Sequence, residues 1–458
     1  MSFAMPDELW HAHGWEASPR KGHLSPESND ADGYAVPMTL PLFFDAVLFD
    51  LDGTLVATHR FWLQAARTGV RQGLECLGLE RAVPTPAEWM SIVGLTSEEG
   101  FAKLFPELAS EQRQVLQEAC EVEQERLLKG GMGALMPGAE ALLKRLGSAG
   151  LKLGIASNCG NYYLEQMQQT LGLGNYFDEA YCIDSPAIYN KGDMLERLLL
   201  DFGTRSAVMV GDRAGDRAAA WENGLPAVHC AFGFSGEGEG QGAEACIEDL
   251  GELWELLERR GRWITAILEQ AGALGPAAKR PSLVLGITGD VASGKTLFAR
   301  DVVRLLTHLG HSARCVSLDD FKSSRGPALG PGDFDLERLE QEVLGPHGES
   351  GGYLVLEGPY LLDPRLQSRL DRSIYLEVTE EVMWRRLTGL QAREKGLHAL
   401  SDLRTGLIPA IQQHRQHYDP TRLADLLVEA SNPLGPAVPS IAQESSQDST
   451  RESTREIG

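Results

Sequence analysis

Two aspartates separated by one residue follow a short apolar run near residue 50. The run Ala46–Phe49 is typical of a buried strand, and Asp50 and Asp52 come directly after it. The Gly-Thr pair that follows predicts a turn, which can bring both carboxylates toward one pocket. Active sites of α/β proteins form at the carboxyl ends of their strands. The pair fits such a site, although a solvated turn could have the same sequence.

Three later segments place further reactive side chains in a fixed order. Ser157 follows the apolar run Leu151–Ala156, Lys191 lies in the segment YNKGDML, and Asp212 and Asp216 lie in the segment VMVGDRAGD. Carboxylates at the end of a strand can hold a hard cation such as Mg²⁺. With the DLDGT segment that contains Asp50, these segments resemble the four motifs of the haloacid dehalogenase superfamily.

The resemblance implies a phosphatase that works through a covalent intermediate. Asp50 would attack a phosphoryl group and form an aspartyl-phosphate, which splits one difficult displacement into two. Asp52 would protonate the leaving group and then activate water. Mg²⁺ would sit on Asp50, the backbone carbonyl of Asp52 and Asp212, where it offsets the repulsion between carboxylate and phosphate. The residues expected to hold the phosphoryl oxygens are Thr54, Ser157 and Lys191, with Asp216 supporting either the metal or Lys191.

The residues around the first motif distinguish among branches of the superfamily. The family's dehalogenases lack the second aspartate, so Asp52 favours phosphate chemistry. The mutase branch keeps Asp-Thr and a His in its hinge, whereas this chain reads Val-Ala-Thr-His, and we interpret His59 as an exposed histidine. The helical patterning over residues 57–135 resembles the inserted cap of phosphoglycolate-phosphatase-type members, which closes over small substrates. We assign no role to the charged residues Arg60, Arg67 and Lys103 of this cap.

A second phosphate-binding pattern begins at Gly289. The apolar segment LVLGIT precedes it, and Gly294, Lys295 and Thr296 complete the pattern GxxxxGKT before the helical segment LFARDVVRLLTHLG. Backbone N–H groups of such a loop can surround nucleotide phosphates, while the lysine reaches the β- and γ-phosphates and the threonine binds Mg²⁺. The sequence therefore predicts an ATP site.

Residues 281–430 resemble the uridine kinase and phosphoribulokinase group of P-loop kinases. The resemblance implies that Asp319 takes the proton of the acceptor hydroxyl and that Glu357 contacts Mg²⁺ or its water. Lys322 stands where uridine kinases usually carry Tyr, so uridine is not inferred as the substrate and an anionic acceptor stays open. The residues that resemble the mobile lid are Arg385, Arg386, Arg393 and Lys395, of which Arg393 is expected to bind the nucleotide.

Apolar runs along the chain alternate with helical periodicity, which is the pattern of parallel strands covered by helices. We therefore expect an α/β protein with two doubly wound parallel-sheet domains, a Rossmann-like core with an inserted helical cap and then a P-loop kinase. The runs expected to be strands are Ala46–Phe49, Leu151–Ala156, Ala207–Val210, Leu283–Ile287, Tyr353–Leu356 and Ser373–Leu376.

The composition suggests where the domains end. The expected phosphatase domain covers residues 41–250, and the kinase domain covers residues 281–435. Between them lie a helix over Leu250–Gln270 and the segment AGALGPAAKRP, which we expect to act as a linker at residues 251–280. The ends, residues 1–40 and 436–458, are polar and without periodicity, so we expect disordered tails.

Length and charge narrow the class of protein. The 458 residues leave room for two or three domains. The 65 Asp and Glu against 42 Lys and Arg give a net charge of −23, which disfavours nucleic-acid partners. Seven scattered cysteines without CxxC spacing and the lack of a long apolar segment predict a soluble cytoplasmic protein.

These features support one leading hypothesis and two alternatives. The leading one is a bifunctional enzyme, a Mg²⁺-dependent phosphatase of a small phosphomonoester joined to an ATP-dependent kinase of a small hydroxyl metabolite. The first alternative is end repair of nucleic acids, since polynucleotide kinase-phosphatases join the same two superfamilies, but the charge and the cap oppose it. The second is a nucleotide-gated regulatory module, which the complete set of reactive side chains opposes.

Overall fold

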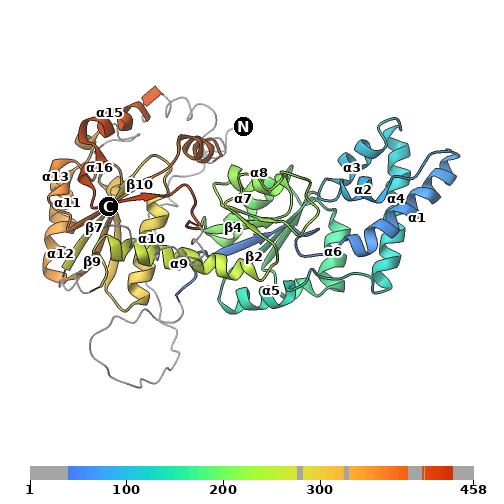
Figure 1. The fold of residues 1–458 in the computed structure, drawn as a ribbon, viewed down its shortest axis with the longest axis horizontal. Coiled ribbons are helices and arrows are strands. Elements are labelled where there is room, and N and C mark those ends of the chain that lie inside the picture. The colour runs from blue at the N-terminus through green and yellow to red at the C-terminus, as the bar shows by residue number, and fades with distance from the viewer. Residues whose placement is uncertain (1–39, 276–281, 324–329, 390–404, 407, 437–458) are drawn as a thin grey trace, which may run out of the picture. The chain divides into compact units, whose positions relative to one another are not determined.

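The computed structural model describes residues 40–275, 282–323, 330–389, 405–406 and 408–436. These residues form two sheets, and every strand pair in both is parallel (Figure 1). The expected α/β fold with two parallel sheets is therefore confirmed. Of the predicted tails, residues 1–40 and 436–458, all but Leu40 and Pro436 lie outside the described residues.

The first sheet has six strands in the order β3-β2-β1-β4-β5-β6. Chain order thus runs outward from β1 in both directions, as in a doubly wound sheet. The strands are β1 (Ala46–Phe49), β2 (Lys152–Ser157), β3 (Glu179–Cys182), β4 (Ala207–Gly211), β5 (Ala227–Cys230) and β6 (Ala245–Ile247). The central strands β1 and β4 are buried along their whole length, which explains their continuous apolar sequence.

Helices cover both faces of this sheet. Because side chains alternate along a strand, Val47 and Phe49 of β1 enter the core on one face, and Ala46 and Leu48 enter the core on the other. The first face is covered by α5 (Ala139–Ser148), α6 (Asn161–Thr170) and the start of α9 (Glu252–Gln270). The second face is covered by α7 (Lys191–Phe202) and α8 (Ala214–Glu222). A 3₁₀ turn, η2 (Leu173–Asn175), follows α6.

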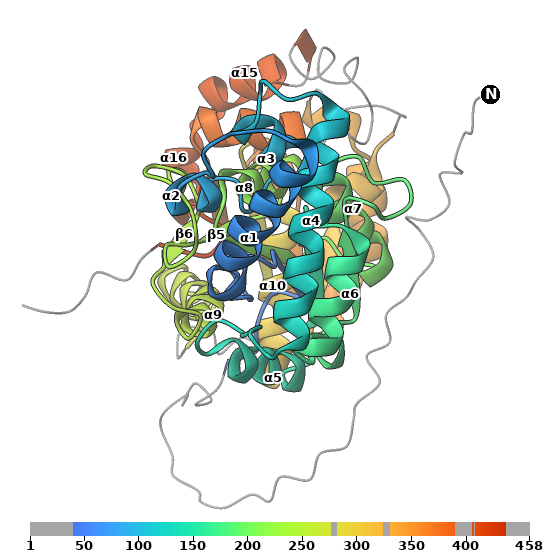
Figure 2. The same cartoon turned by 90° about the vertical axis from the view of Figure 1, so that its right-hand side faces the viewer.

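A helical insertion separates β1 from α5. Its helices are α1 (His59–Leu77), α2 (Pro86–Met90), α3 (Ser97–Leu104) and α4 (Ser110–Lys129). The two connections to the core lie next to each other, because Ala57 N–H donates to Ala134 O at 2.9 Å. The long helices α1 and α4 pack side by side, as Figure 2 shows, and Gly69 permits this because a Cβ there would lie 2.5 Å from the backbone of Cys120.

The second sheet has five strands in the order β11-β10-β7-β9-β8. These are β7 (Ser282–Gly289), β8 (Ala313–Ser317), β9 (Gly352–Glu357), β10 (Arg372–Glu377) and β11 (Leu426–Glu429). One face packs against α9 and α10 (Lys295–His308). Further helical elements of this part are η4 (Leu318–Phe321), η5 (Pro331–Asp333), α11 (Leu336–Leu339), η6 (Glu340–Leu344), α12 (Gly345–Ser350), α13 (Pro364–Gln367), α15 (Ile408–Tyr418) and α16 (Pro420–Leu423), and residues 380–389 are helical as well.

The segment between the two sheets differs in part from the sequence prediction. The helix expected over Leu250–Gln270 is confirmed as α9, whose first half adds Leu253 and Leu257 to the core of the first sheet. Its second half and the residues after it belong to the core of the second sheet, where Ala273 and Leu274 are buried. Residues 271–274 of the expected linker therefore pack into this core, because small and apolar side chains there continue the packing of the helix.

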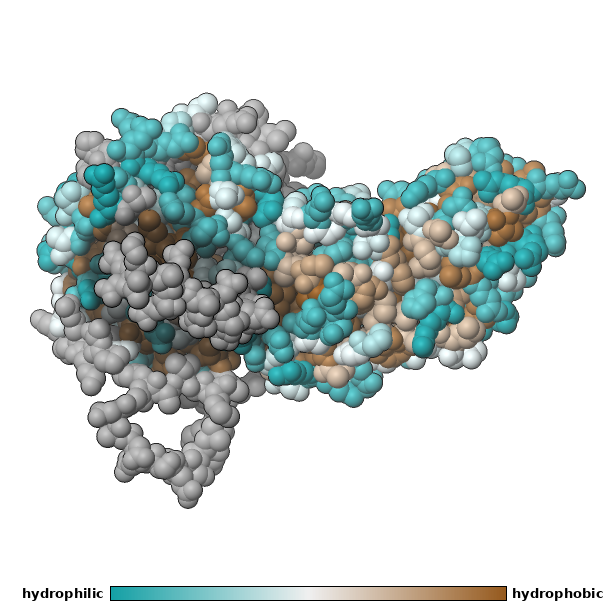
Figure 3. Space-filling view, in the orientation of Figure 1, coloured by the Kyte–Doolittle hydropathy of each residue, from teal (hydrophilic) through white to brown (hydrophobic). Residues whose placement is uncertain are grey.

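The helices in the part of the chain that the structure describes give no sign of a membrane span. There, none of the helices combines the length and the apolar character that a crossing requires. On the face shown in Figure 3, apolar residues are interspersed with hydrophilic ones.

Candidate functional site

The reactive side chains of the first domain meet at one edge of its sheet. Asp50 follows β1, Ser157 ends β2 and Asp212 follows β4. Phe49, the last residue of β1, pairs with Ile155 on one side and Val210 on the other, so these three strands end at nearly the same level. Parallel pairing therefore brings together residues that lie far apart in the sequence.

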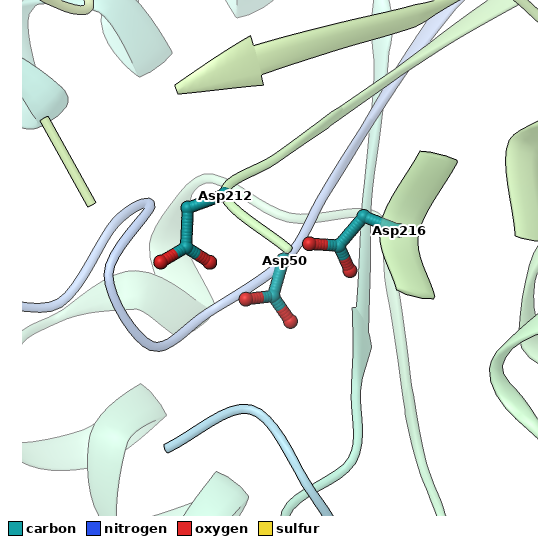
Figure 4. Close-up of side chains that lie close together, drawn as sticks. All are labelled: Asp50, Asp212 and Asp216. Atoms are coloured by element: carbon teal, nitrogen blue, oxygen red, sulfur yellow. The ribbon is translucent and has the colours of Figure 1, made fainter. Parts of the chain in front are cut away.

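Three buried carboxylates form the centre of this site. Oxygens of Asp50, Asp212 and Asp216 all lie within 4.8 Å of one another, and Figure 4 shows the three side chains pointing toward a common space. Asp50 Oδ2 and Asp212 Oδ1 are buried and lack a hydrogen-bond partner. Unpartnered carboxylate oxygens are ligands that Mg²⁺ prefers, so these residues fit a bound divalent cation.

Lys191 supplies a buried positive charge beside these acids. It begins α7, and its Nζ lies 2.6 Å from Asp50 Oδ1 and also pairs with Asp216 Oδ1. The other oxygen of Asp216 accepts a hydrogen bond from the backbone N–H of Arg213 at 2.8 Å. Because both oxygens of Asp216 have donors, its geometry suits holding Lys191 in place. Asp50 and Asp212 keep the free oxygens for a metal.

Burial and mutual repulsion disfavour the charged forms of the acids. Burial raises the pKa of Asp50 well above its usual value, against the opposing charge of Lys191. Burial, followed by the charge of Asp216, raises the pKa of Asp212 to about 7. A divalent cation between these carboxylates would stabilise their charged forms.

Two hydroxyl groups hold the carboxylate of Asp52. Thr58 Oγ1 and Tyr163 OH both donate to Asp52 Oδ1, the latter at 2.6 Å. Burial raises the pKa of Asp52, whereas these hydrogen bonds lower it. Neither hydroxyl was predicted from the sequence to have a role. Thr58 could have been found from its spacing to Asp52, but Tyr163 is 111 residues away and carries no such signal.

The hydroxyls expected to hold phosphoryl oxygens lie at the same edge. The hydroxyl of Thr54 is buried and has no hydrogen-bond partner, as expected for a group that binds a ligand. Ser157 is buried, and its Oγ accepts a weak hydrogen bond from Cys159 N–H at 3.3 Å. Both side chains thus retain the capacity to donate to an anionic oxygen.

Glycines provide the space in which the acids lie. Gly53 has φ of +86°, and a Cβ there would lie 2.4 Å from Asp212 Oδ2. A Cβ on Gly233 would lie 2.2 Å from the Cβ of Asp212, and one on Gly211 would lie 2.3 Å from Asp216 Oδ2. The positions of Asp212 and Asp216 therefore depend on three residues without side chains.

The helical insertion contacts the core beside this site. Asn158 Nδ2 donates to the backbone oxygen of Gly94 at 2.9 Å, and Arg213 donates to that of Ser91 at 3.3 Å. His59, expected to be exposed, is so, with its ring 5.7 Å from that of Phe234. The insertion therefore lies against the core next to the cluster of acids.

The GxxxxGKT loop lies between β7 and α10 in the second domain. Lys295 Nζ donates to the backbone oxygen of Asp290 at 2.8 Å, and Thr296 Oγ1 donates to Glu357 Oε1 at 3.2 Å. Parallel pairing of β7 with β9 brings Glu357 to the loop. The hydroxyl of Ser293 is buried and unpartnered within the loop. These features fit a bound phosphate and a cation beside Thr296.

The other predicted kinase residues are brought together only in part. Asp319 forms an ion pair with Lys322 at 3.1 Å. Arg386 donates to the backbone oxygen of Ala292, inside the loop, at 3.0 Å. Arg385 instead forms an ion pair with Glu244 at 2.6 Å. Two of the predicted lid residues, Arg393 and Lys395, lie outside the described residues. One side chain that the sequence analysis missed, Arg415, pairs with Asp290 of the loop at 3.0 Å.

Known proteins resemble the part of the chain that contains the first of these sites. The sequence pattern of haloacid dehalogenase-like hydrolases matches residues 47–229. A plasmid-encoded phosphoglycolate phosphatase of Cupriavidus necator is 32% identical over 133 residues, which are 28% of this chain and 58% of that protein. A phosphoglycolate phosphatase of Xanthomonas campestris is 29% identical over 218 residues, 46% of this chain and 95% of that protein. A solved structure of a predicted phosphatase from Clostridium acetobutylicum aligns at 23% identity with a TM-score of 0.41, covering 46% of this chain and 97% of that one.

Proposed function

We propose that residues 47–229, which form a haloacid dehalogenase-like hydrolase domain, hydrolyse small phosphomonoesters with the help of Mg²⁺. The observation that carries this proposal is the buried cluster of Asp50, Asp212 and Asp216 around Lys191 at the strand ends. The free carboxylate oxygens can hold a metal ion, and the ammonium of Lys191 beside them can bind a phosphate.

The reaction would proceed in two displacements. Asp50 attacks phosphorus, the bond to the leaving oxygen breaks, and Asp52 gives that oxygen its proton. Asp52 then takes a proton from water, which attacks the aspartyl-phosphate, releases inorganic phosphate and regenerates Asp50. A Mg²⁺ ion on Asp50, Asp212 and the backbone carbonyl of Asp52 would lower the repulsion between carboxylate and phosphate.

Three side chains would bind the transferring group. Lys191 offers its ammonium, Thr54 its unpartnered hydroxyl and Ser157 its Oγ. These donors stabilise charge on the phosphoryl oxygens as it develops. The contact of the insertion with the core beside this site favours a small substrate, and the similarity to phosphoglycolate phosphatases makes 2-phosphoglycolate the first compound to test.

A substrate screen tests this function. The purified full-length chain with Mg²⁺ is expected to release phosphate from at least one small phosphomonoester in a panel that includes 2-phosphoglycolate. A 3′-phosphorylated oligonucleotide in the same panel separates metabolite hydrolysis from nucleic-acid end repair. Release from no member of the panel would contradict the proposal, and release from the oligonucleotide alone would favour end repair.

For the second domain we propose ATP binding and transfer of phosphate to a small hydroxyl compound. The specific observation that favours this is the unpartnered hydroxyl of Ser293 in a loop that also presents Lys295, with Thr296 joined to Glu357. Asp319 is the proposed base for the acceptor hydroxyl. The chain would then be bifunctional, with ATP and a phosphorylated metabolite as its small-molecule partners.

Replacing Lys295 by alanine tests the ATP site. We expect Lys295→Ala to weaken Mg-ATP binding by about 10- to 100-fold, because the ammonium would no longer contact the phosphates. Equilibrium binding of ATP measures this, and phosphate release by the first domain should not change. The control Arg369→Ala removes an exposed ion pair with Glu340 in the same domain. ATP binding that survives in Lys295→Ala would argue against the kinase. Binding without transfer to any acceptor in the wild type would favour a regulatory module.

A further inference from the structure

The carboxylate of Asp52 is fixed through only one of its two oxygens. Thr58 and Tyr163 both donate to Oδ1, and within the described part of the chain no donor contacts Oδ2. A carboxyl group turns readily about its last torsion, because that torsion has broad minima. Two donors from different segments that converge on one oxygen restrict this rotation and leave the second oxygen available.

The two donors come from elements that already build the site. Thr58 immediately precedes α1 and lies six residues after Asp52, on the other side of the turn at Gly53. Tyr163 lies in the first turn of α6, the helix that follows Ser157 at the end of β2. The hydroxyl that reaches Asp52 is therefore positioned by the same strand that delivers the phosphate-binding serine.

Packing does not explain the hydroxyl of Tyr163. Its ring packs against the core of the first sheet and lies 6.4 Å from the ring of Phe61. A phenylalanine ring would fill that space equally well, whereas a half-buried phenol needs a partner. The neighbouring Tyr162 offers a comparison, since it is 55% exposed and donates to Glu125 at 2.5 Å, away from Asp52.

We propose that Tyr163 is a positioning residue that aims Asp52 Oδ2 at the leaving-group oxygen of the substrate. This inference rests on the proposed phosphatase function. In the first displacement the proton on Asp52 Oδ2 passes to the leaving oxygen as the phosphorus–oxygen bond breaks, and in the second Oδ2 takes a proton from water. Tyr163 and Thr58 keep their own protons and remain donors to Oδ1 throughout.

The test compares two esters that differ in their need for an acid. An alkyl phosphate such as 2-phosphoglycolate needs its leaving oxygen protonated, whereas p-nitrophenyl phosphate releases a stable anion without this help. The ratio kcat/KM reports the steps up to release of the leaving group, so it isolates the step in which Asp52 acts as an acid. The variant is Tyr163→Phe, and the matched control is Tyr162→Phe.

We expect Tyr163→Phe to lower kcat/KM for the alkyl phosphate by about 10- to 100-fold and for p-nitrophenyl phosphate by less than about 3-fold. Tyr162→Phe should match the wild type with both. Asp52→Asn should show the same dependence on the leaving group, and adding Tyr163→Phe to it should cause little further loss, because both changes affect one step.

Other outcomes would overturn the inference. Equal losses with the two esters would give the hydroxyl a structural role. The same holds if Tyr163→Phe shows no cooperative unfolding in a thermal melt. Unchanged kinetics with both esters would show that Asp52 needs no help from Tyr163, while the phosphatase function would stand. If the wild type and Tyr162→Phe hydrolyse neither ester nor any other phosphomonoester, the proposed function itself fails, and this inference with it.

Discussion

Replacing Asp50 by asparagine should reduce phosphate release from phosphomonoesters by at least about 10³-fold, because the amide cannot form the acyl-phosphate bond. The side chain keeps its size, so the fold should persist. Steady-state assays measure the loss, and trapping with beryllofluoride and Mg²⁺ should modify Asp50 in the wild type and not in the variant.

A matched control is available on the same domain. Asp201 near the end of α7 is exposed and pairs with Arg197 and Tyr181, so Asp201→Asn should keep nearly full activity. ATP binding should also be the same in Asp50→Asn as in the wild type if the two sites act independently. If the Asp50→Asn variant retains substantial hydrolysis, Asp50 is not the nucleophile.

Removing the divalent cation should abolish hydrolysis, and adding Mg²⁺ should restore it. Asp50 and Asp212 supply the unpartnered oxygens for the cation, and without it their charges repel an incoming phosphate. Asp212→Asn should need a much higher Mg²⁺ concentration for activity. Titration with Mg²⁺ after treatment with EDTA measures this, and activity that persists in EDTA would exclude the proposed metal role.

Binding of the same cation should also raise the stability of the protein, by an amount that depends on pH. The pKa of Asp212 in the folded protein is raised from 3.8 to about 7, so between these values the folded state holds more protons than the unfolded state. The free energy of unfolding without metal therefore contains a contribution that falls as pH rises through this range. Because protons compete with the metal, Mg²⁺ should raise the melting temperature by several degrees at pH 8 and by less at pH 6. An equal shift at both pH values would contradict this reasoning.

Much of the candidate site could be predicted because its residues follow strongly apolar strands. The strands after which Asp50 and Asp212 lie are buried throughout, so their sequences stand out. Once parallel pairing is assumed, their carboxyl ends must lie together. The order of the motifs along the chain was therefore enough to predict that Asp50, Asp212 and Asp216 lie together.

Other features depend on contacts that no local pattern records. The strands missing from the predicted set are β3, β5, β6, β8 and β11. Of these, β3, β6, β8 and β11 are partly exposed and therefore less apolar. The hydrogen bond from Tyr163 to Asp52 depends on where α6 begins relative to β1. The burial of Ala273 and Leu274 depends on the path of the chain after α9, which a Gly- and Ala-rich segment does not reveal.

Gly233, which lies against the side chain of Asp212, affects how inactive relatives should be recognised. Gly233 lies outside all four motifs, yet a single added methyl group there would collide with Asp212 at 2.2 Å. A homologue with alanine at this position could preserve every reactive group and still be unable to hold its cation. Surveys that separate active enzymes from pseudoenzymes by their acids and lysine alone would count such a protein as competent.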